Sequence, residues 1–275
     1  MPVITNTPWE LKRYPGGKIW VKREDLCSPA PGPAFSKIRG VQAALRNRLN
    51  HPIPPEHIAV LDSIHSKAGW GVSWLAREYG IPVTVYYPTL VSEAPGHVRP
   101  FQRKCAEFGA TIVPLKATKS AVMWYQARKL FGAAAPGGWL LPNGLKLSES
   151  IDETAIELTT YTPPELGQEG TWVVSVSSGT IAAGVAKGLT QIGFRGKLIL
   201  HLGYSRSIPE VLAYVGQYAF GYKMEAVDEG YGYADLVNCA HDFPCNPWYD
   251  LKAWKWIQES EQRFPKPVCF WNIGA

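Results

Sequence analysis

The chain has 275 residues and a net charge of +5, with hydrophobic residues making up 46%. This length suits one or two domains with a sizeable core. No apolar run reaches about 18 residues, which excludes an ordinary membrane-spanning helix, and the first residues lack the apolar stretch of a signal peptide. The five cysteines are scattered without zinc-ligand spacing. We therefore expect no metal site, reduced thiols and a cytoplasmic location.

Strand-like and helix-like segments alternate along the chain. An early strand-like run that ends in an acidic turn covers residues 19–29, and a late helix begins at Asp250. Between and after them we expect strands at 58–61, 82–87, 111–114, 172–176, 197–202, 223–227 and 268–271, and helices at 69–79, 98–108, 119–130, 181–189 and 208–220. Such alternation predicts an α/β fold with open parallel sheets and helices on both faces. Ligands of these folds bind where strands end and helices begin.

A Pro/Gly-rich connector at residues 133–144 interrupts this alternation. We expect residues 45–138 to form a smaller α/β lobe. Residues 1–44 and 139–275 would form a larger, ligand-binding lobe. The cleft between the two lobes is where we expect the chemistry to take place.

Lys37 lies in the segment AFSKIRG, at the start of an expected helix that follows an acidic turn. A lysine in such a position is ordinarily a solvated surface residue. To react as a nucleophile, its amine must be partly deprotonated near neutral pH. Burial and a nearby positive charge, such as Arg39, can achieve this.

A polar turn follows the apolar strand WVVSV and precedes the helix IAAGVAKGL. Backbone N–H groups at a helix N-terminus, together with hydroxyl groups, form a cradle for a dianion. The same residue types are also common helix N-caps. The patterns GxGxxG and GxxxxGK[ST] are absent, which argues against nicotinamide and ATP sites. The turn consists of Ser177, Ser178, Gly179 and Thr180.

The order of these motifs resembles the fold-type-II pyridoxal-phosphate (PLP) enzymes of the tryptophan synthase beta-like superfamily. The branch of aminocyclopropane-carboxylate deaminase and D-cysteine desulfhydrase is nearest. Lys37 and Arg39 match the family motif G-N-K-x-R, in which Ser36 replaces asparagine. The resemblance implies a two-lobed fold in which Lys37 joins the cofactor aldehyde as a Schiff base. It also implies that the turn at 177–180 binds the cofactor phosphate.

The segment SIHSKAGWG resembles the family's substrate-carboxylate loop, S-x-N-H. The resemblance implies that Ser63, Ser66 and Lys67 bind the substrate and that Ser66 takes part in catalysis. Lys67 replaces an asparagine that touches the cofactor ring oxygen. A charged lysine cannot accept a hydrogen bond, but it can pair with a ring oxyanion or a substrate carboxylate. The alternative is a helix-capping turn with Lys67 in solvent.

The segment NPWYDLK matches the family motif D-P-V-Y-E-G-K. The resemblance implies that Tyr249 borders the substrate and that Asp250 binds the pyridine nitrogen, keeping it protonated and the cofactor a strong electron sink. Asp250 is also a good helix N-cap. Tyr231 aligns with a family tyrosine that faces the cofactor, which implies that it either relays a proton or stacks on the cofactor ring, and Tyr233 is the alternative. Asn272 replaces the histidine of the family's H-T-G-G tail.

The function implied is that of a PLP-dependent lyase or deaminase acting at the alpha carbon of an amino acid or amino-acid-like group. Deamination, elimination and decarboxylation remain open, and we expect a small amino-acid substrate and a homodimer. A second hypothesis is an amino acid attached to a nucleic-acid base, as in phage DNA hypermodification. A third is a non-catalytic relative. The second would use a basic face to contact the nucleic-acid backbone, formed by Arg99, Arg103, Lys104, Lys116 and Lys119.

Overall fold

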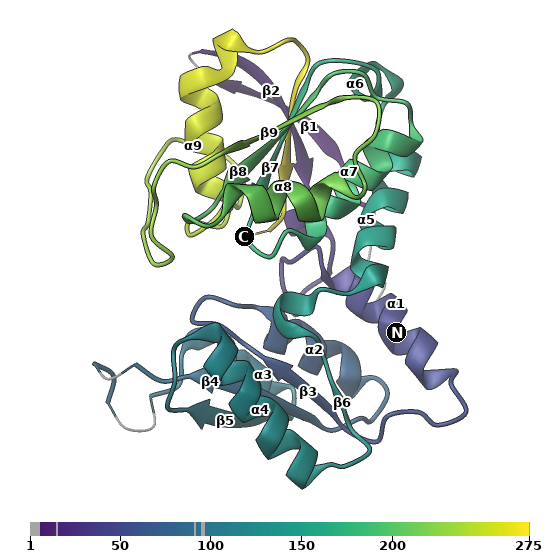
Figure 1. Cartoon of the computed structure of the whole chain (residues 1–275), viewed down its shortest axis with the longest axis vertical. Helices are drawn as coiled ribbons and strands as arrows, with labels where there is room; N and C mark the ends of the chain where they lie inside the picture. Colours follow the sequence, from purple (N-terminus) through teal and green to yellow (C-terminus); the bar gives the residue numbers. More distant parts are fainter. Residues whose placement is uncertain (1–5, 15, 91, 95–96, 275) are drawn as a thin grey trace. The chain divides into compact units, whose positions relative to one another are not determined.

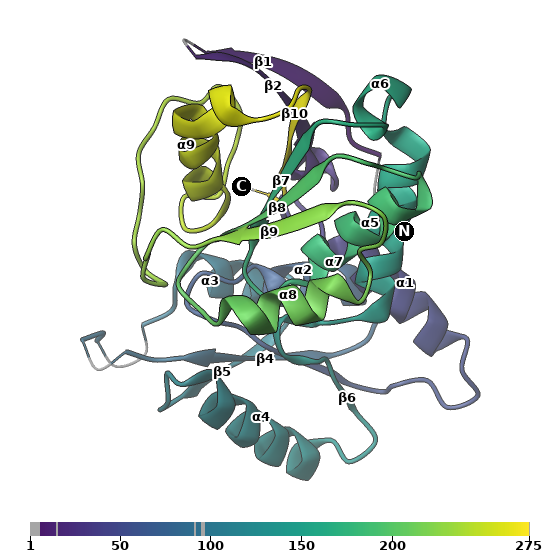
Figure 2. The same cartoon turned by 45° about the horizontal axis from the view of Figure 1, so that its top comes forward.

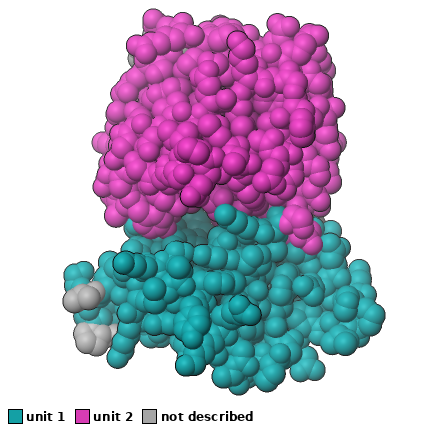
Figure 3. Space-filling model, in the orientation of Figure 1, with its two compact units in different colours: residues 1–3, 29–33, 41–147 teal, residues 4–28, 34–40, 148–275 magenta. Residues whose placement is uncertain are grey.

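The computed structural model describes residues 6–14, 16–90, 92–94 and 97–274. These residues divide into two compact units, coloured separately in Figure 3. Among the described residues, unit 1 comprises 29–33 and 41–147, and unit 2 comprises 6–28, 34–40 and 148–274. The boundaries proposed for separately folding lobes, at residues 45 and 138, stay a prediction.

Unit 2 is built on a six-stranded sheet. Its strands, in order across the sheet, are β1 (Trp9–Tyr14), β2 (Gly17–Arg23), β10 (Val268–Asn272), β7 (Thr171–Val176), β8 (Lys197–Leu202) and β9 (Lys223–Val227). All neighbouring pairs are parallel except β1 and β2, which form an antiparallel hairpin. The sheet therefore carries an antiparallel edge strand that the alternation pattern did not predict, because β1 and β2 follow each other without a helix between them.

Helices cover both faces of this sheet, as Figures 1 and 2 show. The first face carries α5 (Ser148–Tyr161), α7 (Thr180–Gln191) and α8 (Ile208–Gly216), and the second carries α9 (Asp250–Ser260). The fully buried strand β7 explains why both faces need a cover. Its side chains alternate, so that Trp172 and Val174 pack toward the first face and Val173 toward the second. Short turns of helix occur at α6 (Pro164–Gly167), η1 (Glu24–Leu26) and η3 (Glu261–Arg263).

Unit 1 contains a smaller sheet in which all described pairs are parallel. Its strands, in order, are β5 (Thr111–Leu115), β4 (Val83–Pro88), β3 (Ile58–Leu61) and β6 (Trp139–Leu140). Helix α4 (Ser120–Ala134) packs Met123, Ala127 and Phe131 on one face, at the four-residue spacing of a helix stripe. Helices α2 (Ala68–Arg77) and α3 (Pro100–Glu107) cover the other face (Figure 2). The short helix η2 (Asn143–Leu145) follows β6.

The predicted α/β class with parallel sheets is confirmed, and every strand expected between residues 58 and 271 is present. Helices α1 (Ile38–Leu49) and α5 were not assigned ranges in the sequence analysis. Three buried residues of α5 nevertheless recur at helical spacing, namely Ile151, Ala155 and Leu158. In the described part of the chain no helix is long and apolar enough to cross a membrane.

A buried network of charges joins β2, η1, α1 and α5 within unit 2. Lys22 Nζ lies 2.6 Å from Glu157 Oε1, which also accepts the backbone N–H of Thr7 at 2.9 Å. Arg39 donates to Glu24, and its Nη2 lies 3.7 Å from Glu157 Oε2. The four charged side chains are at most 9% exposed. The guanidinium of Arg39, proposed above as the positive charge beside Lys37, is therefore balanced by two carboxylates.

We expect Lys22→Ala to lower the free energy of unfolding by about 3 kcal/mol or more, because it leaves a buried carboxylate without its closest cation. The measurement is urea unfolding of the purified protein. Lys187→Ala is the matched control, since Lys187 pairs with Asp152 in a half-exposed ion pair, and such pairs contribute about 0–1 kcal/mol. Equal losses for the two variants would contradict a structural role of the network.

Candidate active site

Lys37 lies immediately before α1 in a segment that is fixed to the end of the unit 2 sheet. Ser36 donates its backbone N–H to the Ile273 carbonyl at 3.1 Å, and Phe35 forms a β-bridge with Gly274. Both partners directly follow strand β10. These bonds bring Lys37 to the carboxyl end of the parallel strands, where the alternation pattern predicts the site.

The turn between β7 and α7 lies next to Lys37. The Nζ of Lys37 donates to Ser178 Oγ at 2.7 Å, and Ser178 Oγ lies 3.1 Å from Thr180 Oγ1. Gly179 adopts φ +87°, a left-handed conformation that favours glycine, and an added Cβ would lie 2.9 Å from the Tyr214 ring. The sequence-predicted lysine and the sequence-predicted cradle, 141 residues apart in the chain, thus meet in space.

Two tyrosine hydroxyl groups lie beside the turn that follows β7. Tyr249 Oη donates to Tyr233 Oη at 2.8 Å and also contacts the Ser177 hydroxyl. Burial, followed by the neighbouring Tyr233, raises the pKa of Tyr249 well above its usual value. Tyr249 therefore stays protonated at neutral pH. Arg206 donates to the Ser177 carbonyl and so helps to fix the turn.

Asp250 is the first residue of α9 and is only 2% exposed. Its Oδ1 accepts the backbone N–H of Ile273 at 3.3 Å, which ties α9 to the end of β10. Asn272, in the place of the family histidine, donates Nδ2 to Asp25 Oδ1 at 3.0 Å and to the Pro244 carbonyl at 2.9 Å. Asn272 thus fastens the end of the sheet.

Tyr231 and Tyr233 point to different neighbours. The ring of Tyr231 lies under Lys252 Nζ, 4.9 Å from its centroid, and its hydroxyl contacts Lys255 on α9. The buried Lys252 also donates to the carbonyls of Gly203, at 2.7 Å, and Gly232, at 3.2 Å. Of the two tyrosines, Tyr233 is the one bonded to Tyr249.

The predicted substrate-carboxylate loop belongs to unit 1, between β3 and α2. Ser63 accepts the backbone N–H of Ser66 at 3.3 Å through its carbonyl. Lys67 is 8% exposed, and its Nζ lies 5.3 Å from the centroid of the Phe101 ring. The alternative in which Lys67 extends into solvent is therefore wrong.

A buried carboxylate that the sequence analysis missed organises this loop. Asp62 Oδ1 accepts from Ser66 Oγ at 2.7 Å and from the Gly69 N–H at 2.8 Å, and Gln102 donates to Oδ2 at 3.4 Å. Burial raises the pKa of Asp62 to about 6. Both Asp62 and Arg206 follow the last residues of parallel strands. The rule that ligands bind at strand ends would have drawn attention to them.

The residues around Lys37 fit a phosphate-bearing cofactor. Ser178 and Thr180 supply hydroxyls, the start of α7 supplies backbone N–H groups, and Gly179 keeps the turn free of a side chain that would crowd Tyr214. Ser175 lies in β7, two residues before the turn begins at Ser177, and its buried Oγ has no hydrogen-bond partner in the described structure. An amine, a dianion cradle and a buried carboxylate thus lie at one edge of one sheet. Among the described residues no His, Cys, Asp or Glu cluster could hold a metal ion.

The predicted backbone-contacting face in unit 1 is only partly available. Arg99 is 7% exposed and donates to the Pro88 carbonyl at 2.8 Å and to Glu93 Oε2 at 2.7 Å. Lys104 forms an ion pair with Glu107 at 2.7 Å. The expectation that Arg99 contacts a nucleic-acid backbone is wrong, because the side chain holds the turn that precedes α3.

Residues 1–202 match the family described as pyridoxal-phosphate dependent enzyme, and the chain belongs to this family. A glycyl-dTMP PLP-dependent decarboxylase of Pseudomonas phage M6 is 43% identical to the chain over 285 residues, covering 99% of each protein. PLP is therefore the cofactor of this enzyme.

Solved structures share the fold at low sequence identity. An ACC deaminase homologue superposes with a TM-score of 0.73 at 15% identity, covering 99% of this chain and 91% of that one. The O-acetylserine-dependent cystathionine beta-synthase of Helicobacter pylori superposes with a TM-score of 0.66 at 16% sequence identity. The match covers 98% of this chain and 92% of that one. Maize serine racemase superposes with a TM-score of 0.66 at 15% sequence identity, covering 98% of this chain and 89% of that one. The predicted fold-type-II architecture is confirmed.

The prediction of a PLP-dependent enzyme of lyase type, acting at the alpha carbon of an amino-acid-like group, is also confirmed by these matches. The hypothesis of a non-catalytic relative finds no support in them. The roles of the individual site residues stay predictions.

We expect purified protein loaded with PLP to absorb above ~400 nm, as the cofactor does when its aldehyde is joined to a protein amine. Lys37→Ala should lose this band, because it removes the amine beside the cradle. Lys187→Ala, which alters a lysine on the outer part of α7, is the control and should keep it. A Lys37→Ala protein with an unchanged band would disprove the assignment of Lys37.

Asp62 should also make the stability of unit 1 depend on pH. Its pKa is about 6 in the folded protein against a usual value of 3.8, so the folded state binds a proton more strongly than the unfolded state. Stability contributed by this proton is complete below about pH 4 and is lost as pH rises through 6, by about 3 kcal/mol. We expect urea unfolding to show this decrease in the wild type relative to Asp62→Asn. Parallel pH profiles of the two proteins would contradict it.

Proposed function

We propose that this PLP-dependent enzyme decarboxylates a glycyl group carried by a thymidine nucleotide. The observation that carries the proposal is the full-length match to a glycyl-dTMP PLP-dependent decarboxylase, 43% identical over 99% of both proteins. A site of amine, dianion cradle and buried carboxylate at one sheet edge supports it. Assembly as a homodimer and a cytoplasmic location stay predictions from the sequence.

In this reaction the bond between the alpha carbon and the carboxylate carbon breaks. Carbon dioxide leaves, and one proton takes its place on the alpha carbon. The bound cofactor supplies an electron sink for the electron pair that the departing carbon dioxide leaves behind. The protein must therefore hold the cofactor, hold the carboxylate in position for cleavage, and deliver one proton.

We assign the first requirement, holding the cofactor, to residues of unit 2. Ser178, Thr180 and the N–H groups at the start of α7 bind the phosphate. Asp250, buried at the start of α9, would hold the pyridine nitrogen and favour its protonated form. A nearby negative charge favours the protonated ring, which is the form that accepts electrons best.

We assign proton delivery to Lys37, and we assign Tyr233 and Tyr249 to a supporting proton relay. Lys37 would hold the cofactor aldehyde, and its amine, at hydrogen-bond distance from Ser178, would deliver the proton to the alpha carbon. Tyr249 stays protonated and donates to Tyr233, which is half-buried. A positioned proton donor contributes about 10²–10⁴-fold to a rate. This geometry favours Tyr233 over Tyr231 as the relay.

The loop of unit 1 is proposed to bind the substrate carboxylate. Ser66 is held by Asp62, and Lys67 offers a cation where relatives offer an asparagine. A lysine pairs with a carboxylate through charge as well as hydrogen bonding. We assign Ser63, Ser66 and Lys67 to this role.

The test is incubation of PLP-loaded protein with a thymidine monophosphate that carries a glycyl group with free amine and carboxylate. Mass spectrometry should show loss of one carbon dioxide per molecule. Asp250→Asn should lower kcat about 100-fold or more, because it removes a preorganised charge at the reacting centre. Asp152→Asn, which alters an exposed ion pair, is the control. Turnover of free amino acids, without turnover of the nucleotide, would overturn the proposal.

A further inference from the structure

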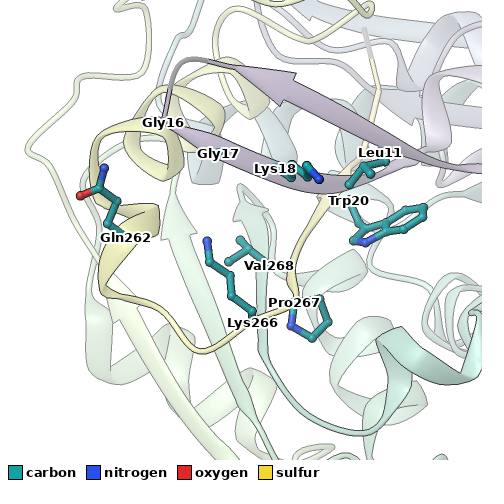
Figure 4. A pocket seen from close by; sticks show the side chains of 9 residues that line it. All are labelled: Leu11, Gly16, Gly17, Lys18, Trp20, Gln262, Lys266, Pro267 and Val268. Atoms are coloured by element: carbon teal, nitrogen blue, oxygen red, sulfur yellow. The ribbon is translucent and has the colours of Figure 1, made fainter.

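Unit 2 contains an open pocket of about 580 Å³ that the proposed reaction does not use (Figure 4). It lies under the β1–β2 hairpin, beside the segment that leads from η3 into β10. The residues that line it are Leu11, Gly16, Gly17, Lys18, Trp20, Gln262, Lys266, Pro267 and Val268.

This pocket lies at the opposite end of the strands from Lys37. Lys18 and Val268 are at the starts of β2 and β10, whereas the turn at 177–180 follows the end of β7, and these three strands run parallel. Strands of five to seven residues separate the two ends, which corresponds to about 20 Å. The pocket is therefore a site separate from the cofactor cradle.

The charge at the pocket is positive. Lys18 and Lys266 extend along it, and no carboxylate is among the residues that line it. Arg13 is paired with Lys18 in the hairpin register, so both exposed cations lie on the same face of the hairpin. Partial burial lowers the pKa of Lys266, although the residue remains exposed.

An aromatic ring completes the pocket. Trp20 is half-buried, packing partly against the core of unit 2 and partly lining the pocket. Its indole is thus held in place while part of it stays accessible. Fixed aromatic rings beside a basic groove are the combination that binds single-stranded nucleic acid, because bases stack on the rings and phosphates lie along the cations.

We propose that this pocket binds a single-stranded DNA segment, with backbone phosphate at Lys18 and Lys266 and a base against Trp20. The inference deepens the proposed function, on which it rests for the choice of a DNA ligand. The separation of about 20 Å means that a free nucleotide at the cofactor cannot fill both sites, whereas a strand can. The enzyme would then hold its substrate as part of a polymer.

The test is fluorescence anisotropy of a labelled single-stranded oligodeoxynucleotide of about 12 nucleotides, with PLP-loaded protein at several salt concentrations. Lys18→Glu combined with Lys266→Glu should weaken binding at least tenfold and reduce the salt slope by about 2. The matched control is Lys129→Glu combined with Lys223→Glu, which makes the same charge change at exposed lysines outside the pocket. It should change binding less than threefold. Trp20→Leu should weaken binding at least fivefold with the salt slope unchanged.

Equal binding by the pocket variant and the control variant would overturn the inference, as would a wild type that binds the oligonucleotide no more tightly than dTMP. Decarboxylation of the glycyl mononucleotide should be unchanged in the pocket variant, because Lys18 and Lys266 lie away from the cofactor. Failure of the decarboxylase proposal would appear in that activity assay with the wild type. Failure of the inference would appear in the anisotropy comparison, so the two results are distinguishable.

Discussion

The buried charge network of unit 2 is the interaction on which the site depends. Lys22, Glu157, Glu24 and Arg39 come from four separate elements, and each charge is balanced inside the unit. Arg39 lies two residues after Lys37, so its fixation also restricts the position of Lys37. Buried ion pairs of this kind cost desolvation energy and become strongly destabilising when one partner is lost. The protein thereby couples correct packing of α5 and β2 to correct placement of Lys37.

Parallel strands then bring the remaining groups to the same edge. The cradle follows β7, Arg206 follows β8, and the segment that holds Lys37 is bonded to the end of β10. Each loop begins where a strand stops, and a helix often begins directly after it. Helix N-termini and loop hydroxyls are therefore concentrated there. An enzyme that binds a cofactor with a phosphate group and a reactive ring can therefore hold both groups with these loops, and the sheet keeps its regular geometry.

Several residues depart from the pattern of relatives, and the structure gives each a physical role. Asn272 fastens the end of β10 to Asp25 and the Pro244 carbonyl. Lys67 is buried against Phe101, and Asp62 holds the turn that carries Ser66. The departure at Lys67 lies in the loop assigned to the substrate, whereas the departure at Asn272 lies at the end of strand β10 in unit 2.

The sequence by itself determined the α/β class and the alternation of elements, and it predicted a lysine, a cradle and a Tyr–Asp pair whose roles stay predictions. These features are local, since they rest on apolar periodicity, Gly and Ser turns, and short motifs. Only the tertiary structure decided that Lys37 donates to Ser178 and that Arg39 pairs with Glu24 and Glu157. It also decided that Tyr233 forms a hydrogen bond with Tyr249, whereas the Tyr231 ring contacts Lys252. Side-chain partners far apart in the chain depend on strand order and register, which no local pattern specifies. The antiparallel strand β1 and the basic pocket beneath it were decided in the same way.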